Sequence, residues 1–361
     1  MSKTETQDHF AWHASGRAEL DGYDLADLAE QYPTPFYLVS VGQLRDNYRR
    51  FKAAFSDVDG LRCYYSVKSN FESIVIRTLT EEGCGGEISG ALDLELVKRA
   101  GMPPENVVYD GPRKTAADIE AALIFGVHLI DIESMTEAKT INAIAQKLGK
   151  KVNVGIRIDP LLPRPYYDKV ITTYKAKFGF PLDQALEAAV SINEMENLRV
   201  TCIMTHIGSQ VFTPTRYIET LTRIFDLIGK LKGRGVTIDE INLGGGYPAQ
   251  SMKNWRLSRR IILARVLEKF GKLEADVKSI DDFGTAISSH YHKLRKETGL
   301  DPKLSLEPGR CLVSNAACMV GHIDIVKNDW VFTDVSINDV PENLFFSEWR
   351  MVLPGDRKSV V

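Results

Sequence analysis

The sequence lacks any apolar run close to the ~20 residues that a membrane-spanning helix needs, so we expect neither an integral membrane protein nor a membrane partner. Residues 1–17 lack the apolar core of a secretory signal. The sequence also lacks a charge excess, because 45 Lys and Arg oppose 48 Asp and Glu, giving a net charge of -3. Such a balance argues against a nucleic-acid-binding surface, and we expect no nucleic-acid partner.

Cysteine is scarce, with five among 361 residues, an odd number that includes no Cys-x-x-Cys pair. No cysteine spacing suits a zinc site, so we predict no metal. Buried or partly buried free thiols fit a reducing compartment, which predicts a cytoplasmic protein. His290 and His292 form the one close histidine pair, but an i,i+2 pair does not share a helix face, so we assign both to the surface.

The composition is that of a globular protein, with 44% hydrophobic and 26% charged residues. The length suggests two domains, or one large α/β barrel with an appendage. Short β-rich runs recur along the chain at fairly regular intervals. The eight runs are Arg62–Val67, Gly86–Ser89, Asn106–Asp110, Leu129–Glu133, Lys151–Ile158, Val200–His206, Glu240–Leu243 and Lys303–Glu307.

Helical patterns fill the gaps between these runs. In residues 134–148 the apolar side chains recur at helical spacing. Ser134 and Glu137 form a capping-box pattern at the start of this segment, and Gly149 is a natural stop. Eight strands alternating with helices over about 250 residues predict a (β/α)8 TIM barrel. A doubly wound open sheet is the structural competitor, because the same alternation produces both folds.

The two ends of the chain differ from this rhythm. Leu312–Val326 and Trp330–Ile337 are typical of strands without intervening helices, whereas the polar N-terminal stretch contains one short helical patch, Leu25–Tyr32. We therefore predict three parts. Residues 1–36 form a segment that covers the barrel or packs on the β domain, residues 37–310 form the barrel, and residues 311–361 form a partial C-terminal β domain.

Functional groups of such a barrel lie at the C-terminal ends of its strands. In this sequence those positions hold many ionisable groups and glycines, and their concentration on one rim predicts a functional site. The positions are Lys68, Glu87, Asp110, Asp131, Arg157, Asp159, His206, Gly244–Gly246, Glu307 and Arg310.

Lys68 directly follows the first β-rich run, which places its amine at the barrel mouth. A lysine near apolar walls and other cations loses its proton more easily and can form an imine with a carbonyl group. The structural alternative is a solvated surface lysine.

Gly244–Gly246 follow the seventh run, where successive glycines let backbone N–H groups approach an anion closely. A tight turn without a ligand is an equally good interpretation.

His206 ends the sixth run and is suited to act as a general base, a metal ligand or a flat surface against a planar cofactor. A histidine bonded within the rim is its structural alternative. Ser209 offers a hydroxyl to a phosphate, although loop serines usually cap turns.

Glu307 to Arg310, in the sequence EPGR, close the eighth run. A carboxylate that faces a heteroaromatic nitrogen keeps that nitrogen protonated and makes the ring an electron sink. Arg310 is able to bind a phosphate or carboxylate through two hydrogen bonds. A Glu–Arg ion pair around a Pro-Gly turn is the alternative. Taken together, the rim suits one ligand with a carbonyl, a phosphate, a ring nitrogen and a flat face, and pyridoxal 5′-phosphate (PLP) has all four.

These blocks make the sequence similar to the fold-type III PLP-dependent decarboxylases. That group contains the diaminopimelate, ornithine and arginine decarboxylases and shares its barrel with alanine racemase. The blocks occur in the family's order over roughly residues 25–340, and the block HIGSQ resembles the diaminopimelate branch more than the ornithine branch. The matching blocks are Tyr65–Asn70 (YSVKSN), Lys177–Gly179 (KFG), His206–Gln210 (HIGSQ), Gly244–Pro248 (GGGYP) and Glu307–Arg310 (EPGR).

The resemblance implies three catalytic residues: Lys68 as the Schiff-base lysine, His206 stacked on the pyridine ring and Glu307 as partner of the ring nitrogen. It implies that Arg310 faces the phosphate or the substrate carboxylate. It also implies a homodimer with shared active sites. The cofactor-binding residues that it implies are Lys68, His206, Ser209, Gly244, Gly245, Gly246, Glu307, Pro308, Gly309 and Arg310.

Three departures from the family pattern bear on the substrate and on the proton donor. Glu87 stands where the family usually has an aspartate, and Asp93 or Glu95 replaces its following glutamate. Residues 334–346 contain no Arg-Pro-x-x-Tyr, so the usual diaminopimelate-binding arginine and tyrosine have no counterpart. The family's Cys-x-x-x-Asp block and its later phosphate-binding tyrosine have no counterpart before Val361, so we expect a truncated C-terminal domain.

The sequence therefore predicts a PLP-dependent decarboxylase of an amino acid or an amino-acid conjugate. The expected chemistry is loss of CO2 from a substrate bound in place of Lys68, with the resulting carbanion delocalised into a pyridinium that Glu307 keeps protonated. Three alternatives stay open: a PLP-binding protein without catalysis, an amino-acid racemase and a barrel aldolase that uses Lys68 without PLP. Glu307 argues against the racemase, because racemase-like proteins usually place an arginine opposite the ring nitrogen.

Overall fold

The computed structural model describes residues 9–12, 17–160, 177–249, 277–328, 330–336 and 338–339. The chain divides into two compact units. One contains residues 48–248 and 277–312, and the other contains residues 1–47, 249–276 and 313–361. The three-part division at 36/37 and 310/311 stays a prediction, and the part of the expected C-terminal domain from residue 340 onward lies outside the described residues.

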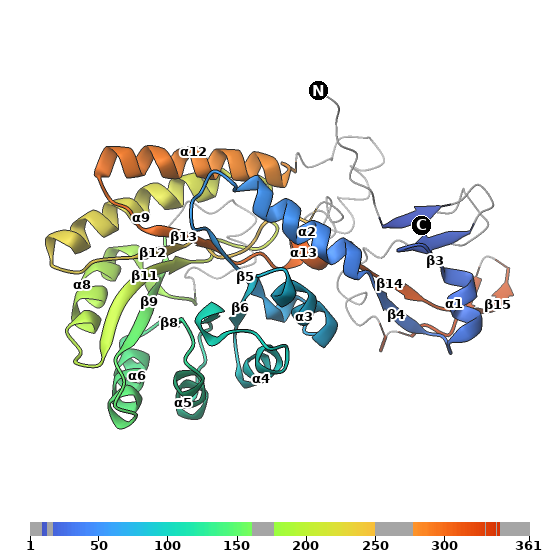
Figure 1. The fold of residues 1–361 in the computed structure, drawn as a ribbon, viewed down its shortest axis with the longest axis horizontal. Coiled ribbons are helices and arrows are strands. Elements are labelled where there is room, and N and C mark those ends of the chain that lie inside the picture. Colours follow the sequence, from blue (N-terminus) through green and yellow to red (C-terminus); the bar gives the residue numbers. More distant parts are fainter. Residues whose placement is uncertain are drawn as a thin grey trace. The chain divides into compact units, whose positions relative to one another are not determined.

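The larger unit contains a closed barrel of eight parallel strands (Figure 1). The strands pair in the order β9-β11-β12-β13-β5-β6-β7-β8, and β8 pairs back onto β9. This closure confirms the predicted (β/α)8 barrel and excludes the open, doubly wound sheet. The strands are β5 (Arg62–Ser66), β6 (Gly85–Ile88), β7 (Val107–Tyr109), β8 (Leu129–Ile132), β9 (Val152–Asp159), β11 (Leu198–Thr205), β12 (Glu240–Asn242) and β13 (Lys303–Leu306).

The barrel strands are buried along nearly their whole length, because one face meets the barrel interior and the other meets the helices. Tyr64, Val108, Leu129, Cys202 and Met204 form a buried cluster contributed by four of these strands. A two-residue strand, β10 (Phe180–Pro181), adds to β9 outside the closed barrel.

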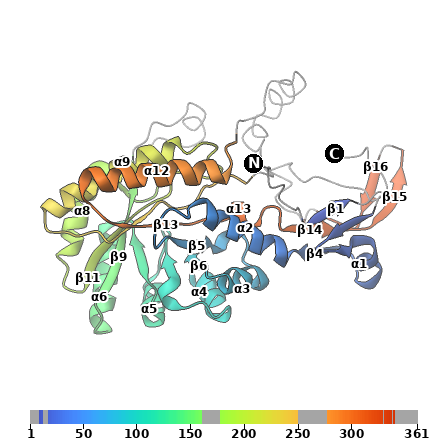
Figure 2. The same ribbon diagram turned by 45° about the horizontal axis from the view of Figure 1, so that its top comes forward.

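Helices cover the outside of the barrel strands (Figures 1 and 2). The helix predicted after Ser134 begins there, since the Ser134 hydroxyl accepts a hydrogen bond from the Glu137 N–H at 3.2 Å. The Glu137 carboxylate does not return to Ser134 but accepts from the Glu133 N–H at 2.7 Å. The helices are α3 (Ser73–Glu81), α4 (Ala91–Arg99), α5 (Ala116–Phe125), α6 (Met135–Lys147), α8 (Leu182–Asn193), α9 (Thr215–Gly233) and α12 (Ile280–Thr298).

Three short turns connect these elements or carry site residues. They are the 3-10 turns η1 (Val67–Ser69) and η2 (Pro104–Asn106) and the four-residue helix α13 (Arg310–Val313). A longer helix, α2 (Val41–Ala54), precedes β5 in sequence. None of the helices in the described part of the chain is long and apolar enough to cross a membrane.

The smaller unit is β-rich in its described part. The strands β1 (Phe10–Trp12), β2 (Ala18–Leu20) and β3 (Tyr23–Asp24) form one antiparallel sheet, followed by helix α1 (Leu25–Gln31). Its described part also contains two strand pairs: β4 (Phe36–Val39) with β14 (Ala317–Val320), and β15 (Ile323–Lys327) with β16 (Trp330–Thr333) (Figure 2). The long strand predicted from Leu312 is wrong at its start, because Leu312 lies in α13 and the strand begins at Ala317.

Candidate active site

Lys68 lies in η1, the turn that directly follows β5, and half of its side chain is exposed. Its ammonium donates a hydrogen bond to Glu87, the side chain of which is completely buried. Parallel pairing sets this contact, since Ser66 at the end of β5 lies beside Glu87 on β6. The Ser66 hydroxyl also donates to Glu87, and the Ser89 hydroxyl donates to it at 3.2 Å.

The charge state of Lys68 differs from the prediction. Burial lowers the pKa of the Lys68 amine, but the nearby carboxyl groups, Glu87 foremost, outweigh this effect, so the pKa lies above its ordinary value. The expected weakening of the proton by neighbouring cations is therefore wrong. The Glu87 carboxylate contacts the amine instead, and it stabilises the protonated form.

Glu307 directly follows β13 and is only 1% exposed. Its Oε1 atom accepts a hydrogen bond from the Asn242 Nδ2 group at 2.8 Å. Burial raises the pKa of Glu307 well above its ordinary value, and the nearby carboxylates of Glu87 and Asp110 raise it further. The raised pKa favours the protonated form of Glu307 in the cofactor-free site, and a protonated acid is suited to share its proton with a ring nitrogen.

His206 directly follows β11, and its ring is neutral. Burial and the positive charges of Lys68 and Arg157 lower the pKa of His206 from 6.5 to about 4. The Nδ1 atom accepts a hydrogen bond from the Gly245 N–H at 3.2 Å, so the ring proton is on Nε2. A neutral, flat imidazole in a fixed tautomer is suited to lie against a planar ligand.

The lowered pKa of His206 predicts acid sensitivity of the cofactor-free protein. The unfolded chain binds a proton at His206 near pH 6.5 and the folded chain only near pH 4, so the free energy of unfolding falls as the pH falls through this range. We expect a loss on the order of 3 kcal/mol from this group, measured by urea unfolding at several pH values. His206→Phe should reduce this pH dependence, whereas the control His322→Gln should not. An unchanged profile in His206→Phe would contradict the assignment.

The turn Gly244–Gly246 brings its backbone against His206 and Glu307. Gly246 has a φ of 95°, and a Cβ atom there would lie 2.2 Å from the Gly208 carbonyl oxygen, so only glycine fits. A Cβ at Gly245 would lie 2.4 Å from the Glu307 carbonyl oxygen. The Gly244 N–H donates to the Asn242 side chain at 2.9 Å and the Gly245 N–H to His206. Two of the three amides predicted to face an anion therefore have protein partners.

The turn EPGR packs on the residues that flank Lys68. The Ser66 N–H donates to the Pro308 carbonyl at 3.1 Å, and a Cβ at Gly309 would lie 2.3 Å from the Ser69 hydroxyl oxygen. Arg310 is the first residue of α13. Ser209 is exposed in the loop after β11. Their proposed contacts with a phosphate stay predictions.

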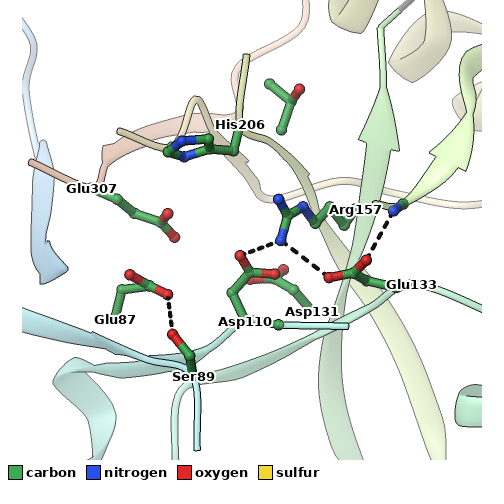
Figure 3. Close-up of polar contacts among 12 residues, drawn as sticks. Glu87, Ser89, Asp110, Asp131, Glu133, Arg157, His206 and Glu307 are labelled. Carbon is green, nitrogen blue, oxygen red and sulfur yellow. Dashed lines mark hydrogen bonds and ion pairs between the residues drawn. The ribbon is translucent and has the colours of Figure 1, made fainter. Parts of the chain in front are cut away.

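A charged group from three neighbouring strands completes the site (Figure 3). The Arg157 Nη1 group donates to Asp110 at 2.6 Å and to Glu133 at 3.1 Å, and its guanidinium lies 4.5 Å from the centre of the Phe178 ring. The strand-end rule identified Arg157 and Asp110 as rim residues but gave them no role. Glu133 and Asn242 were missed, since neither belongs to a motif.

The residues at these strand ends fit pyridoxal phosphate. The strand ends bring together an amine, a fully buried acid with a raised pKa, a neutral flat imidazole and a turn of glycines in which no Cβ fits. Within the described ranges, no group of three His, Cys, Asp or Glu side chains is arranged to hold a metal ion.

Comparison with known proteins agrees with this chemistry. Residues 41–314 match the family model described as the pyridoxal binding domain of pyridoxal-dependent decarboxylases. The diaminopimelate decarboxylase of Methanocaldococcus jannaschii is 28% identical over 350 residues, which cover 94% of this chain and 75% of the relative. The enzyme of the same name from Vibrio cholerae is 29% identical over 352 residues, which cover 96% of this chain and 78% of the relative.

A solved structure extends the match to three dimensions. The crystal structure of diaminopimelate decarboxylase from M. jannaschii superposes with a TM-score of 0.83 at 28% identity, covering 95% of this chain and 77% of that one. The same enzyme in complex with L-lysine gives a TM-score of 0.80 at 29% identity, covering 94% and 76%. The barrel, the site at its strand ends and these matches show that the chain belongs to the pyridoxal-dependent decarboxylases, which are amino-acid carboxy-lyases with pyridoxal 5′-phosphate as their cofactor.

Proposed function

We propose that Lys68, His206 and Glu307 hold the cofactor and direct the decarboxylation of an α-amino acid. Lys68 would bind the aldehyde carbon, Glu307 would face the ring nitrogen and His206 would cover one face of the ring. The observation that carries this proposal is the fully buried acid Glu307, which shares the strand ends of the barrel with an amine held by Glu87. When bound, pyridoxal phosphate supplies the electron sink that accepts the electron pair left by departing CO2.

The side chains then have separate tasks. Burial favours the protonated form of Glu307, and Asn242 donates a hydrogen bond to its Oε1 atom, so Glu307 would hold a proton where the ring nitrogen lies. Glu87 orients the Lys68 amine by accepting a hydrogen bond from it, and the hydroxyls of Ser66 and Ser89 keep that carboxylate in place. His206 adds no charge to the ring, because its pKa is about 4.

We propose further that the substrate belongs to the diaminopimelate class or is a conjugate of such an amino acid. Two relatives are named diaminopimelate decarboxylases, and one solved relative holds L-lysine. The sequence between residues 334 and 346 lacks the Arg-Pro-x-x-Tyr motif, which favours a substrate with a distal end different from that of free diaminopimelate.

Release of CO2 from carboxyl-labelled substrates tests this function. The 361-residue chain would be loaded with PLP and supplied with diaminopimelate, lysine, ornithine, arginine, glutamate and conjugates of these amino acids. We expect release from one substrate class, with one amine formed per CO2 and none without PLP. Racemisation of a substrate without CO2 release, by a chain that binds PLP, would overturn the proposal.

We also propose a cytoplasmic homodimer. The five cysteines are free thiols, and Cys63, Cys84 and Cys202 are buried, as expected in a reducing compartment. The family resemblance supports the dimer. Sedimentation of the PLP-loaded chain should give twice the monomer mass, and a monomer at micromolar concentration would contradict it.

A further inference from the structure

Asp110, which directly follows β7, and Asp131 of the neighbouring strand β8 both belong to the site (Figure 3). The register pairs Tyr109 of β7 with Ile130 of β8, so the next residues, Asp110 and Asp131, occupy corresponding positions on neighbouring chain segments, where strands are spaced about 4.8 Å apart. Asp131 in turn lies beside Gly155 of β9. The position of Asp131 requires that glycine, because a Cβ at Gly155 would lie 1.8 Å from the Asp131 Oδ1 atom.

Both carboxyl groups are buried, and they have oxygens without a donor. Neither oxygen of Asp131 receives a hydrogen bond from the described residues, and the same holds for Oδ1 of Asp110. The other oxygen of Asp110 accepts from Arg157 at 2.6 Å. Thus three buried carboxyl oxygens of Asp110 and Asp131 receive no hydrogen bond from the described residues. A proton on one of the two acids would supply a donor for such a bond.

The nearby cations do not neutralise Asp131. Arg157 donates to Asp110 and Glu133, and no bond joins it to the Asp131 carboxyl group among the described residues. The completely buried Lys114 ammonium donates to the Gly111 carbonyl, to the main-chain carbonyl of Asp131 and to the Glu137 carboxylate, each at 2.7 Å. All three of its protons therefore have other acceptors.

A buried carboxylate without a cation or a hydrogen bond is very unfavourable, and a second carboxylate beside it makes ionisation worse. A single proton shared by two adjacent acids removes both costs. We propose that Asp131 is protonated and donates a hydrogen bond to Oδ1 of Asp110. In this proposal the acid–carboxylate pair positions Arg157 in the active site.

The electrostatic surroundings agree with this assignment. Burial raises the pKa of Asp131 well above its ordinary value, and the charge of Asp110 raises it further. Lys114, in the segment after β7, and Arg157 on β9 oppose this rise, whereas Glu240 on β12 adds to it. Burial raises the pKa of Asp110 too, but Arg157, Lys114 and Lys68 outweigh it and leave that carboxyl ionised. The two acids therefore titrate as a pair that holds one proton.

Infrared spectroscopy of the full chain without cofactor tests the shared proton directly. We expect the C=O stretch of a protonated carboxyl group at pH 7.5, a part of which disappears in Asp131→Asn. Glu307→Gln should remove a separate part of this band, because burial favours the protonated form of Glu307 too. An unchanged protonated-carboxyl band in Asp131→Asn would overturn the proposal. This readout needs neither PLP nor a substrate.

Kinetics test the positioning role, which rests on the proposed decarboxylase function. The side-chain amide introduced by Asp131→Asn can donate to Asp110, so we expect kcat/KM within about threefold of the original, without the decline at high pH that loss of the shared proton causes. Asp131→Leu has no donor, and we expect about a tenfold loss of kcat/KM. Equal activities of the Asn and Leu variants would contradict the positioning role. If Asp131→Leu does not fold, the pH profile of Asp131→Asn is the test. Loss of the high-pH decline in kcat/KM supports the positioning role, and a decline like that of the original chain contradicts it.

Discussion

Replacing Lys68 by alanine is expected to lower the rate of CO2 release by at least ~10³-fold. The amine is the nucleophile at the strand ends that Glu87 contacts directly, and its removal takes away both the attachment of the cofactor and a group that carries a proton. The PLP-loaded variant would be compared with the original chain by initial rates on the substrate found in the labelled panel.

Lys139→Ala is the matched control, because Lys139 is an exposed lysine of the outer helix α6 and does not lie at a strand end. It should retain full activity. Lys68→Ala should remain folded, since half of the Lys68 side chain is exposed and its loss opens no core cavity. Turnover near the original rate in folded Lys68→Ala would contradict the role of this lysine.

Glu307→Gln is expected to lower kcat by about 10²–10³-fold, because the variant loses the proton that would stabilise charge on the ring while keeping the side-chain shape. The Gln side chain can still accept from Asn242, so the fold and the cofactor site should persist. Binding of PLP and kcat would be measured separately. Full turnover with normal PLP binding would contradict the role of Glu307.

The same substitution has a second expected effect, on stability. The pKa of Glu307 is raised in the folded protein, so the neutral acid favours folding at low pH and this contribution disappears as the pH rises through the folded-state pKa. The cofactor-free Glu307→Gln protein should therefore lose less stability at alkaline pH than the original chain does. Glu187→Gln, which changes an exposed glutamate paired with Arg234, is the control. It should leave the loss of unfolding free energy at alkaline pH unchanged.

The order and number of the barrel strands could be predicted from the sequence because alternating buried strands and capped helices leave a periodic signal. Each of the eight predicted runs corresponds to a barrel strand. The strand-end rule then predicted that Lys68, His206 and Glu307 lie on one rim, and they do lie at the ends of β5, β11 and β13. The end of the chain was less predictable, since Leu312 is as apolar as a strand residue but lies in a short helix.

The electrostatics of the site could not be predicted in the same way. The pKa of Lys68 depends on which side chain β6 places beside it, and only the register shows that this is Glu87. Likewise, Gly155 appears in the sequence as an ordinary strand glycine. Its importance follows from the carboxyl group of Asp131, which occupies the space where a Cβ would lie.

Locating the covalent attachment of the cofactor tests the role of Lys68 most directly. The PLP-loaded chain would be reduced with borohydride, digested and analysed by mass spectrometry for a pyridoxyl-phosphate adduct. We expect one modified peptide that contains Lys68, and no adduct in Lys68→Ala. An adduct on another lysine, or none in a chain that binds PLP, would contradict the assignment of Lys68 as the Schiff-base lysine.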